Sequence, residues 1–320
     1  MKKKRKGFTL VELLVVIAII ALLMGILMPA LARVRAIAFR VVCGTNLAGL
    51  GKAMLIYAND YEDELPQAGY PGSAWVAGLP NWDGPGRVQA YDRPPGKVTV
   101  SSNFYLLIKY SEVGAKQFVC RGTDTREFKI PPGTLRPGTQ EPLELIDCFD
   151  FGPDPIPYCS YSYHAAIDPD GAKFALNVAS SQPGMAVAAD RNPWLDPAAL
   201  IGDLLDFLPD ILPWDGTAEQ AKLGNALAHG GEGQNVLFLD SHVAYEKRSF
   251  CGVMDDNIYT YWTDPTGRDR QLGSQPMDGS AIPRHKEDSL LLNEGKPGAG
   301  GGTTGTTGTT TGTTTGGAPK

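Results

Sequence analysis

The 320-residue chain has few cysteines, and their spacing gives no sign of a metal ribbon. The five are Cys43, Cys120, Cys148, Cys159 and Cys251, and no two form a C-x-x-C pair. If the body of the chain lies outside the cytoplasm, one or two disulfides are expected. Cys148 with Cys159 is the easiest local pair, and Cys43 with Cys120 would tie a helix to the following domain. Buried free thiols are the alternative for all five.

The sequence also lacks the signatures of large enzyme classes and of nucleic-acid binding. It has no G-x-S-x-G elbow, and the glycine-rich stretch HGGEGQ, which starts at His229, lacks the Lys-Ser/Thr of a phosphate loop. Of 29 Lys and Arg, five occupy residues 2–6, which leaves 24 against 35 Asp and Glu. Phosphate binding needs clustered positive charge. We therefore expect no nucleic-acid partner and no enzymatic activity.

What the chain does have is a basic N-terminal run followed by a long apolar segment. Residues 2–6 read KKKRK, and Phe8 to Met28 is nearly unbroken Leu, Ile, Val, Ala and Met. About 20 apolar residues span a bilayer, and the positive charges before the span place the N-terminus in the cytoplasm. A cleavable secretory signal is the first alternative, but the segment is too long and ends in no clear small-x-small site.

The apolar segment contains one acidic residue, Glu12, which a plain membrane anchor does not need. A carboxylate at mid-span costs roughly 2.5–3.5 kcal/mol, and less near the end of a span, where Glu12 lies. It still needs a cationic partner, and the segment contains no basic residue. Cleavage after Gly7 would give Phe8 a free α-amine, and that amine on a neighbouring copy could neutralise Glu12.

The stretch KGFTLVELLVVIAII, residues 6–20, resembles the class III signal of type IV pilins and type II secretion pseudopilins. The resemblance implies cleavage between Gly7 and Phe8 by a prepilin peptidase, methylation of the Phe8 amine, and a role for Glu12 in subunit docking. It also implies that other pilin subunits, an inner-membrane assembly machinery and the lipid bilayer are partners. Pro29 stands where many pilins carry a helix-breaking proline.

The sequence predicts one long helix from about Phe8 to Tyr57, kinked near Pro29, because apolar residues recur at helical spacing on both sides of the proline. The first half would lie in the membrane or in a filament core, and the second half would pack on a globular domain. Gly44, Gly49 and Gly51 weaken the helix, so a bend or break there is an alternative.

After residue 60 the composition shifts to Pro, Gly, Trp and Tyr, which indicates a globular head with irregular loops. We expect a helix at 102–113 with Ser101 or Ser102 as its N-cap, and a helix at 196–214 interrupted by Pro209 and Pro213. Strands are predicted in KQFVC at 116–120 and at 157–167, 184–191, 235–239 and 242–247, the last two joined at Asp240-Ser241.

These elements predict an α+β fold, in which a long N-terminal helix packs on a C-terminal globular domain with an antiparallel β-sheet. The expected organisation is a cleaved leader at 1–7, a helix at 8–59 with its transmembrane part at 8–28, a pilin-like head at 60–290 and a tail at 291–320. The Gly/Thr-rich tail cannot bury a core and should be flexible.

Blocks of the head, among them KQFVC, SYSYH and AADR, resemble the large pilin-like proteins of planctomycetes and related bacteria. Those proteins carry a His, a nine-residue spacer and Asp-Gly. Here His229 is followed by ten residues and then by Asp240-Ser241. With His242, these residues could form a facial metal site. The interpretation we favour is that His229 packs a loop and Asp240 holds the turn.

Calcium is the better metal candidate, because Asp255, Asp256 and Asn257 supply the hard oxygen donors that it prefers. A solvated acidic turn is the favoured alternative, so we predict no cofactor unless calcium binds there.

Taken as a whole, the chain is predicted to be a structural subunit of a periplasmic or extracellular filament, a type IV pilus or a type II pseudopilus. Before assembly it would be a single-pass inner-membrane protein with a cytoplasmic N-terminus, and afterwards part of a periplasmic or cell-surface filament. The alternative is a membrane-anchored surface binding protein or enzyme that uses the pilin-type signal for delivery.

Overall fold

A computed structural model describes residues 10–69, 74–75, 82–83, 97–165, 174–196, 217, 222–276 and 281–294. These residues form an α+β arrangement, as predicted: one long helix and a head built around an antiparallel sheet. The expected processing site at Gly7 and Phe8, the Gly/Thr-rich tail and nearly all of the expected helix at 196–214 lie outside the described residues.

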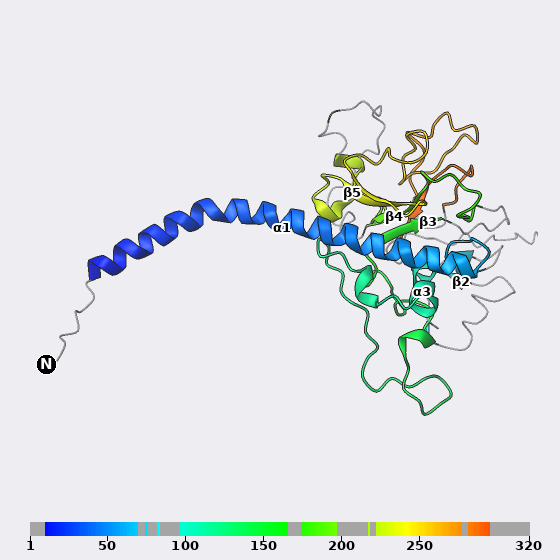
Figure 1. The fold of residues 1–320 in the computed structure, drawn as a ribbon, viewed down its shortest axis with the longest axis horizontal. Helices are drawn as coiled ribbons and strands as arrows, with labels where there is room; N and C mark the ends of the chain where they lie inside the picture. The colour runs from blue at the N-terminus through cyan, green and yellow to red at the C-terminus, as the bar shows by residue number, and fades with distance from the viewer. Residues whose placement is uncertain are drawn as a thin grey trace, which may run out of the picture.

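The first element is α1 (Leu10–Asp60), a continuous helix of 51 residues that is long and apolar enough to cross a membrane. Residues 10–38 are exposed, and burial begins at Cys43 and continues through Leu47, Leu50, Met54 and Tyr57. Figure 1 shows the N-terminal half of α1 projecting away from the head, while the C-terminal half runs across it. The predicted packing of the second half of the helix on the head is therefore confirmed.

The glycines of α1 do not break the helix; they allow it to approach the head. A Cβ atom added at Gly51 would lie 2.6 Å from Leu237 Cδ1, and one at Gly49 would collide with the side chain of Gln117. The alternative of a helix break in this region is wrong, because close packing against the head compensates for the low helix propensity of the glycines. The chain also passes through Pro29 without leaving the helix.

The head contains a five-stranded antiparallel sheet in the order β6-β5-β4-β3-β7. Its strands, in chain order, are β3 (Tyr161–His164), β4 (Ala186–Asp190), β5 (Gln234–Phe238), β6 (Val243–Glu246) and β7 (Leu291–Leu292). The first four confirm the strands predicted between 157 and 247. α1 contacts β5 and β6 on one side and α3 (Val100–Tyr110) on another (Figure 1).

β7 moves the predicted boundary between head and tail. Leu292 pairs with Tyr163 and Leu291 with His164, and the following Asn293 and Glu294 are buried. The head therefore includes residues at least as far as Glu294 rather than ending at 290, because this short apolar segment completes the edge of the sheet.

The remaining described elements are short. A two-stranded parallel pair joins β1 (Ala74–Trp75) to β2 (Lys97–Val98), and four 3-10 turns follow at η2 (Ala115–Phe118), η3 (Leu145–Asp147), η6 (Lys222–Gly224) and η7 (Leu227–His229). The strand predicted at 116–120 is wrong, because most of that segment is η2.

The N-cap predicted for α3 is also wrong. Thr99 is the cap, and its hydroxyl oxygen accepts a hydrogen bond from the Ser102 N–H. Ser101 and Ser102 lie inside the first turn, where the Ser101 hydroxyl donates to Asp150 and the Ser102 hydroxyl donates to the Thr99 carbonyl. Three neighbouring hydroxyl residues are candidates for the cap, and the buried carboxylate of Asp150 accepts hydrogen bonds from the hydroxyls of both Thr99 and Ser101.

Candidate functional site

The exposed half of α1 is the first candidate region, because it presents apolar side chains on every side. The large apolar residues from Leu10 to Ile37 are 46–76% exposed. Burying one such side chain is worth about 1.5–3 kcal/mol. Glu12 lies in the first turn of this segment and Pro29 lies in its interior. A surface of this kind requires an apolar environment, either lipid or the helices of other subunits.

The other half of α1 is fastened to the head by covalent and polar contacts. Cys43 forms a disulfide with Cys120, which closes a link across 77 residues of sequence. Beside it, Asn46 Nδ2 donates to the Val119 carbonyl at 3.0 Å, and the guanidinium of Arg40 lies 4.0 Å from the ring centroid of Tyr245. α1 and the head therefore form a joined unit.

The pairing of Cys43 with Cys120 is one of the alternatives left open by the sequence. The easiest local pair, Cys148 with Cys159, does not form, and both of these cysteines are buried free thiols. Burial raises the pKa of each of them to about 12, so neither is a reactive thiolate at neutral pH.

His229 lies beside the disulfide, at the end of η7, and faces a buried carboxylate. Its Nε2 atom is 3.3 Å from Asp190 Oδ2, and the two side chains are 5% and 0% exposed. Asn235, in β5, holds the same carboxylate oxygen through its backbone N–H at 2.7 Å and its side-chain Nδ2 at 3.1 Å. His229 therefore belongs to a polar cluster between α1 and the sheet.

The sequence singled out Asp240, Ser241 and His242 together with His229, but the structure places the three at a different end of β5. Asn235, at the start of β5, contacts His229, whereas Asp240 follows the strand, about 16 Å further along at 3.3 Å per residue. The facial metal site considered for His229, Asp240 and His242 is therefore not assembled.

Asp240 instead holds the β5–β6 turn, as predicted. Its Oδ1 accepts hydrogen bonds from the backbone N–H and the ring Nδ1 of His242, and Ser241 between them has a φ of 67°. Slight burial raises the pKa of Asp240, but the hydrogen bonds from His242 outweigh it and leave the pKa below its ordinary value.

Two of the three residues suggested for calcium, Asp256 and Asn257, are already engaged in contacts within the head, whereas Asp255 is exposed. Asp256 accepts hydrogen bonds from Trp262 Nε1 at 2.5 Å and from the Ser289 N–H at 2.8 Å, and Asn257 Oδ1 accepts from the Tyr259 N–H at 3.2 Å. Burial and the neighbouring Asp288 raise the pKa of Asp256 well above its ordinary value. Asp256 and Asn257 are buried, so the favoured interpretation of a solvated acidic turn is wrong for these two residues, and calcium binding stays the alternative that the sequence left open.

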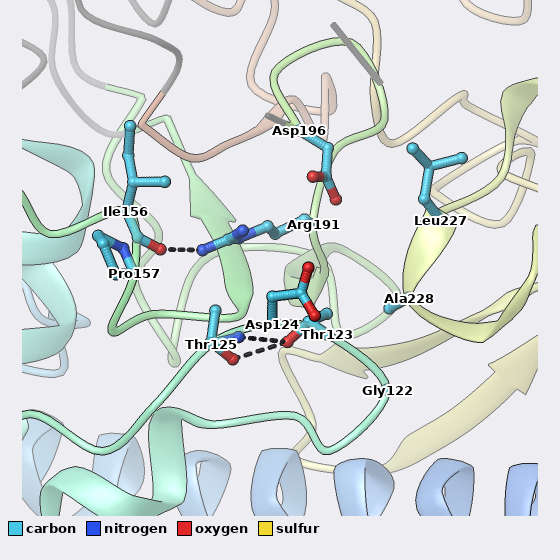
Figure 2. Close-up of a pocket in the computed structure, with 10 residues that line it drawn as sticks. All are labelled: Gly122, Thr123, Asp124, Thr125, Ile156, Pro157, Arg191, Asp196, Leu227 and Ala228. Carbon is cyan, nitrogen blue, oxygen red and sulfur yellow. Dashed lines mark hydrogen bonds between the residues drawn. The ribbon is translucent and has the colours of Figure 1, made fainter. Parts of the chain in front are cut away.

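A cavity of about 350 Å³ opens close to the His229 cluster (Figure 2). In Figure 2, Arg191 crosses the cavity and its guanidinium points to the carbonyl of Ile156, while the side chains of Asp124 and Asp196 enter from opposite sides. In the sequence, Arg191 stands out only as the last residue of the strand predicted at 184–191, and neither acid belongs to a recognisable motif.

The beginning of the chain has a match among known protein families. Residues 2–28 match the prokaryotic N-terminal methylation motif. This match supports a pilin-like, prepilin-type signal and a membrane-anchored precursor, and it implies processing by a prepilin peptidase. No curated protein and no solved structure matches the chain. The resemblance of the head to planctomycete pilin-like proteins therefore stays a prediction from the sequence.

Proposed function

We propose that this protein is a structural subunit of a filament of the type IV pilus or type II pseudopilus kind. The observation that carries the proposal is the division of α1: residues 10–38 are exposed behind a prepilin-type signal, and the same continuous helix is covalently joined to the head from Cys43 onward. A helix fastened in this way can transfer its apolar half from lipid to neighbouring helices while the head stays outside.

The driving force for assembly would be burial of that apolar half among equivalent helices. Both lipid and a helix bundle accept apolar side chains, so the transfer needs a polar contact that favours the bundle. Glu12 supplies it in this proposal, by pairing with the free amine that cleavage creates on Phe8 of an adjacent subunit. A charge in an apolar medium is stabilised by such a partner.

In this proposal the precursor spans the inner membrane with a cytoplasmic N-terminus, and the mature subunit belongs to a periplasmic or cell-surface filament. Its partners are other pilin subunits, the peptidase, the inner-membrane assembly machinery and the bilayer. The head has no enzymatic role and no nucleic-acid partner.

A second function, a membrane-anchored binding protein, is favoured by one observation, the cavity of Figure 2 with its buried Arg191 and Asp196. A binding protein that uses the signal only for delivery needs the membrane span but does not need Glu12. The role of Glu12 therefore separates the two functions.

The test compares Glu12→Ala with Glu232→Ala, a matched change at an exposed acid of the head. We expect Glu12→Ala to leave membrane insertion and cleavage after Gly7 intact, as read by N-terminal sequencing, and to reduce sheared filaments in electron micrographs at least tenfold. Filaments at the normal level in Glu12→Ala would rule out the assembly role and leave the binding protein as the better account.

A further inference from the structure

The cluster around His229 brings four potential metal ligands together from distant parts of the chain. They are Cys43 in α1, Cys120 after η2, Asp190 at the end of β4 and His229 at the end of η7. One ligand atom from each residue lies within 4.8 Å of all the others. Cys43, Cys120 and Asp190 are fully buried, so the group is enclosed by the fold.

We propose that, when Cys43 and Cys120 are in their dithiol form, these four residues bind a zinc ion. Two thiolates, one imidazole and one carboxylate match the ligand types and the number of ligands that zinc takes in structural sites. The proposal concerns the head alone and does not depend on filament assembly.

The spacing of the ligand atoms fits a tetrahedral ion. Tetrahedral zinc at its usual bond lengths separates a nitrogen and an oxygen ligand by about 3.3 Å and a nitrogen and a sulfur ligand by about 3.6 Å. In the structure, His229 Nε2 is 3.3 Å from Asp190 Oδ2 and 3.8 Å from Cys120 Sγ. His229 therefore already lies at separations from Asp190 and Cys120 that suit zinc, and the two sulfur atoms, which are bonded to each other in the disulfide, must move apart once it is reduced.

The surroundings of the cluster orient its ligands. Asn235 donates two hydrogen bonds to Asp190 Oδ2, while Asp190 Oδ1 is buried and has no hydrogen-bond partner among the described residues. The Gly122 N–H donates to Cys120 Sγ at 3.3 Å, a contact that stabilises a thiolate. A Cβ at Gly122 would lie 2.3 Å from the Ala228 carbonyl oxygen and 3.2 Å from His229 Nδ1, so glycine allows the chain to pass this close to η7 and its imidazole. Hydrogen-bonded partners of this kind fix the ligands of metal sites.

The disulfide and the zinc site are alternative states, because both use the same two sulfur atoms. A dithiol reductant supplies two electrons and two protons to the Cys43–Cys120 bond, giving two thiols, and is itself oxidised to a disulfide. Zinc binding then releases the two thiol protons. In reoxidation, a disulfide oxidant accepts two electrons from the two thiolates and two protons from solvent and becomes two thiols, while the Cys43–Cys120 bond reforms and the zinc ion is released. In both states α1 stays joined to the head through Cys43.

The test uses the full-length chain in detergent micelles. The protein is reduced with dithiothreitol, which is then removed under anaerobic conditions. Cobalt(II) is the probe, because tetrahedral thiolate coordination gives it visible and near-ultraviolet absorption bands. We expect reduced wild-type protein to bind one Co²⁺ per chain, with these bands, and Zn²⁺ to displace it. Oxidised wild-type protein should show no bands.

Five variants test the site. Cys120→Ser and His229→Ala should lose the bands, Asn235→Ala should weaken Zn²⁺ affinity by about 10-fold, and Cys148→Ser should bind as wild type. If Cys120→Ser does not fold, His229→Gln replaces it as the test variant, because it keeps both thiols. Near-ultraviolet circular dichroism reports whether the head is folded. The proposal is overturned if the reduced wild type binds no metal, or if the oxidised protein binds Co²⁺ as well as the reduced protein does. It is also overturned if either His229 variant is folded and keeps the absorption bands unchanged.

Discussion

Gly51 of α1 lies directly against Leu237 of β5, so closely that a Cβ atom at position 51 would be 2.6 Å from the Leu237 Cδ1 atom. This contact fixes how near the long helix comes to the sheet. It also makes position 51 different from Gly25 in the same helix, where an added Cβ would meet nothing within 4 Å.

We therefore expect Gly51→Val to lower the free energy of unfolding of the head by about 1–3 kcal/mol, the usual effect of overpacking. Gly25→Ala is the matched control and should leave the head unchanged, because it lies in the exposed half of α1. Chemical denaturation of the detergent-solubilised protein, followed by tryptophan fluorescence, measures both. Equal stability of the two variants would contradict the close approach at Gly51.

The disulfide should contribute strongly to stability under oxidising conditions. Closing a loop of 77 residues lowers the entropy of the unfolded chain enough to stabilise the fold by roughly 4 kcal/mol. We expect Cys43→Ser to lose about 2–5 kcal/mol in denaturant titrations. Cys251→Ser, which removes a free thiol, should lose much less. An equal loss of unfolding free energy in Cys43→Ser and Cys251→Ser would show that the disulfide does not stabilise the head.

A buried carboxylate at the start of α3 makes stability depend on pH. Glu294 accepts a hydrogen bond from the Ser101 N–H at 2.5 Å, and burial together with the neighbouring Asp150 raises its pKa to about 7. The folded state therefore binds a proton more tightly than the unfolded state, whose ordinary carboxyl pKa is about 4.3. The stability from this proton is complete below that value and is lost as the pH rises through 7.

Glu294→Gln should remove this dependence while keeping an acceptor for Ser101. We expect the variant to gain stability relative to wild type between pH 5 and pH 8, by up to about 3 kcal/mol, in denaturant titrations at each pH. Glu232→Gln, at an exposed position, is the control. A difference between Glu294→Gln and wild type that stays constant across this range would contradict the raised pKa.

The N-cap of α3 provides a local test. Thr99→Ala removes the acceptor for the Ser102 N–H and the hydroxyl that donates to Asp150, so we expect a loss of about 1–2 kcal/mol or slightly more. Thr139→Ala, which removes a hydroxyl that is exposed, should lose less than about 0.5 kcal/mol. Similar losses in thermal or chemical unfolding would argue against Thr99 as the cap.

The elements that sequence predicted well are those with a strong local pattern. The apolar run and helical spacing identify α1, and alternating or continuous apolar residues identify β3 to β6. Local sequence patterns do not predict the structure where a contact with a residue distant in the chain determines it. At the start of α3 the hydroxyls of Thr99 and Ser101 both bind Asp150, about fifty residues away, a contact that no local pattern indicates. Leu291 and Leu292 form a strand because β3 lies beside them.

The candidate site shows the same limit. His229 is conspicuous in the sequence, but its partners Asp190 and Cys120 are brought to it by the sheet and by α1, and no spacing along the chain reveals them. Asp240, the partner suggested by sequence proximity, lies beyond the far end of β5. The N-terminal signal can be predicted from sequence, unlike the His229 cluster. The peptidase and the membrane recognise one continuous stretch of the chain, and that recognition does not depend on the folded head.

The position of Cys43 has a mechanical consequence. It is the first fully buried residue of α1, so a pull on the exposed half of the helix enters the head at the disulfide to Cys120. The covalent bond takes the load before the noncovalent contacts of Leu47, Leu50 and Met54 are stretched. Tension along the helix therefore cannot peel α1 from the sheet one turn at a time, and in force spectroscopy the oxidised head should withstand greater force than the Cys43→Ser head.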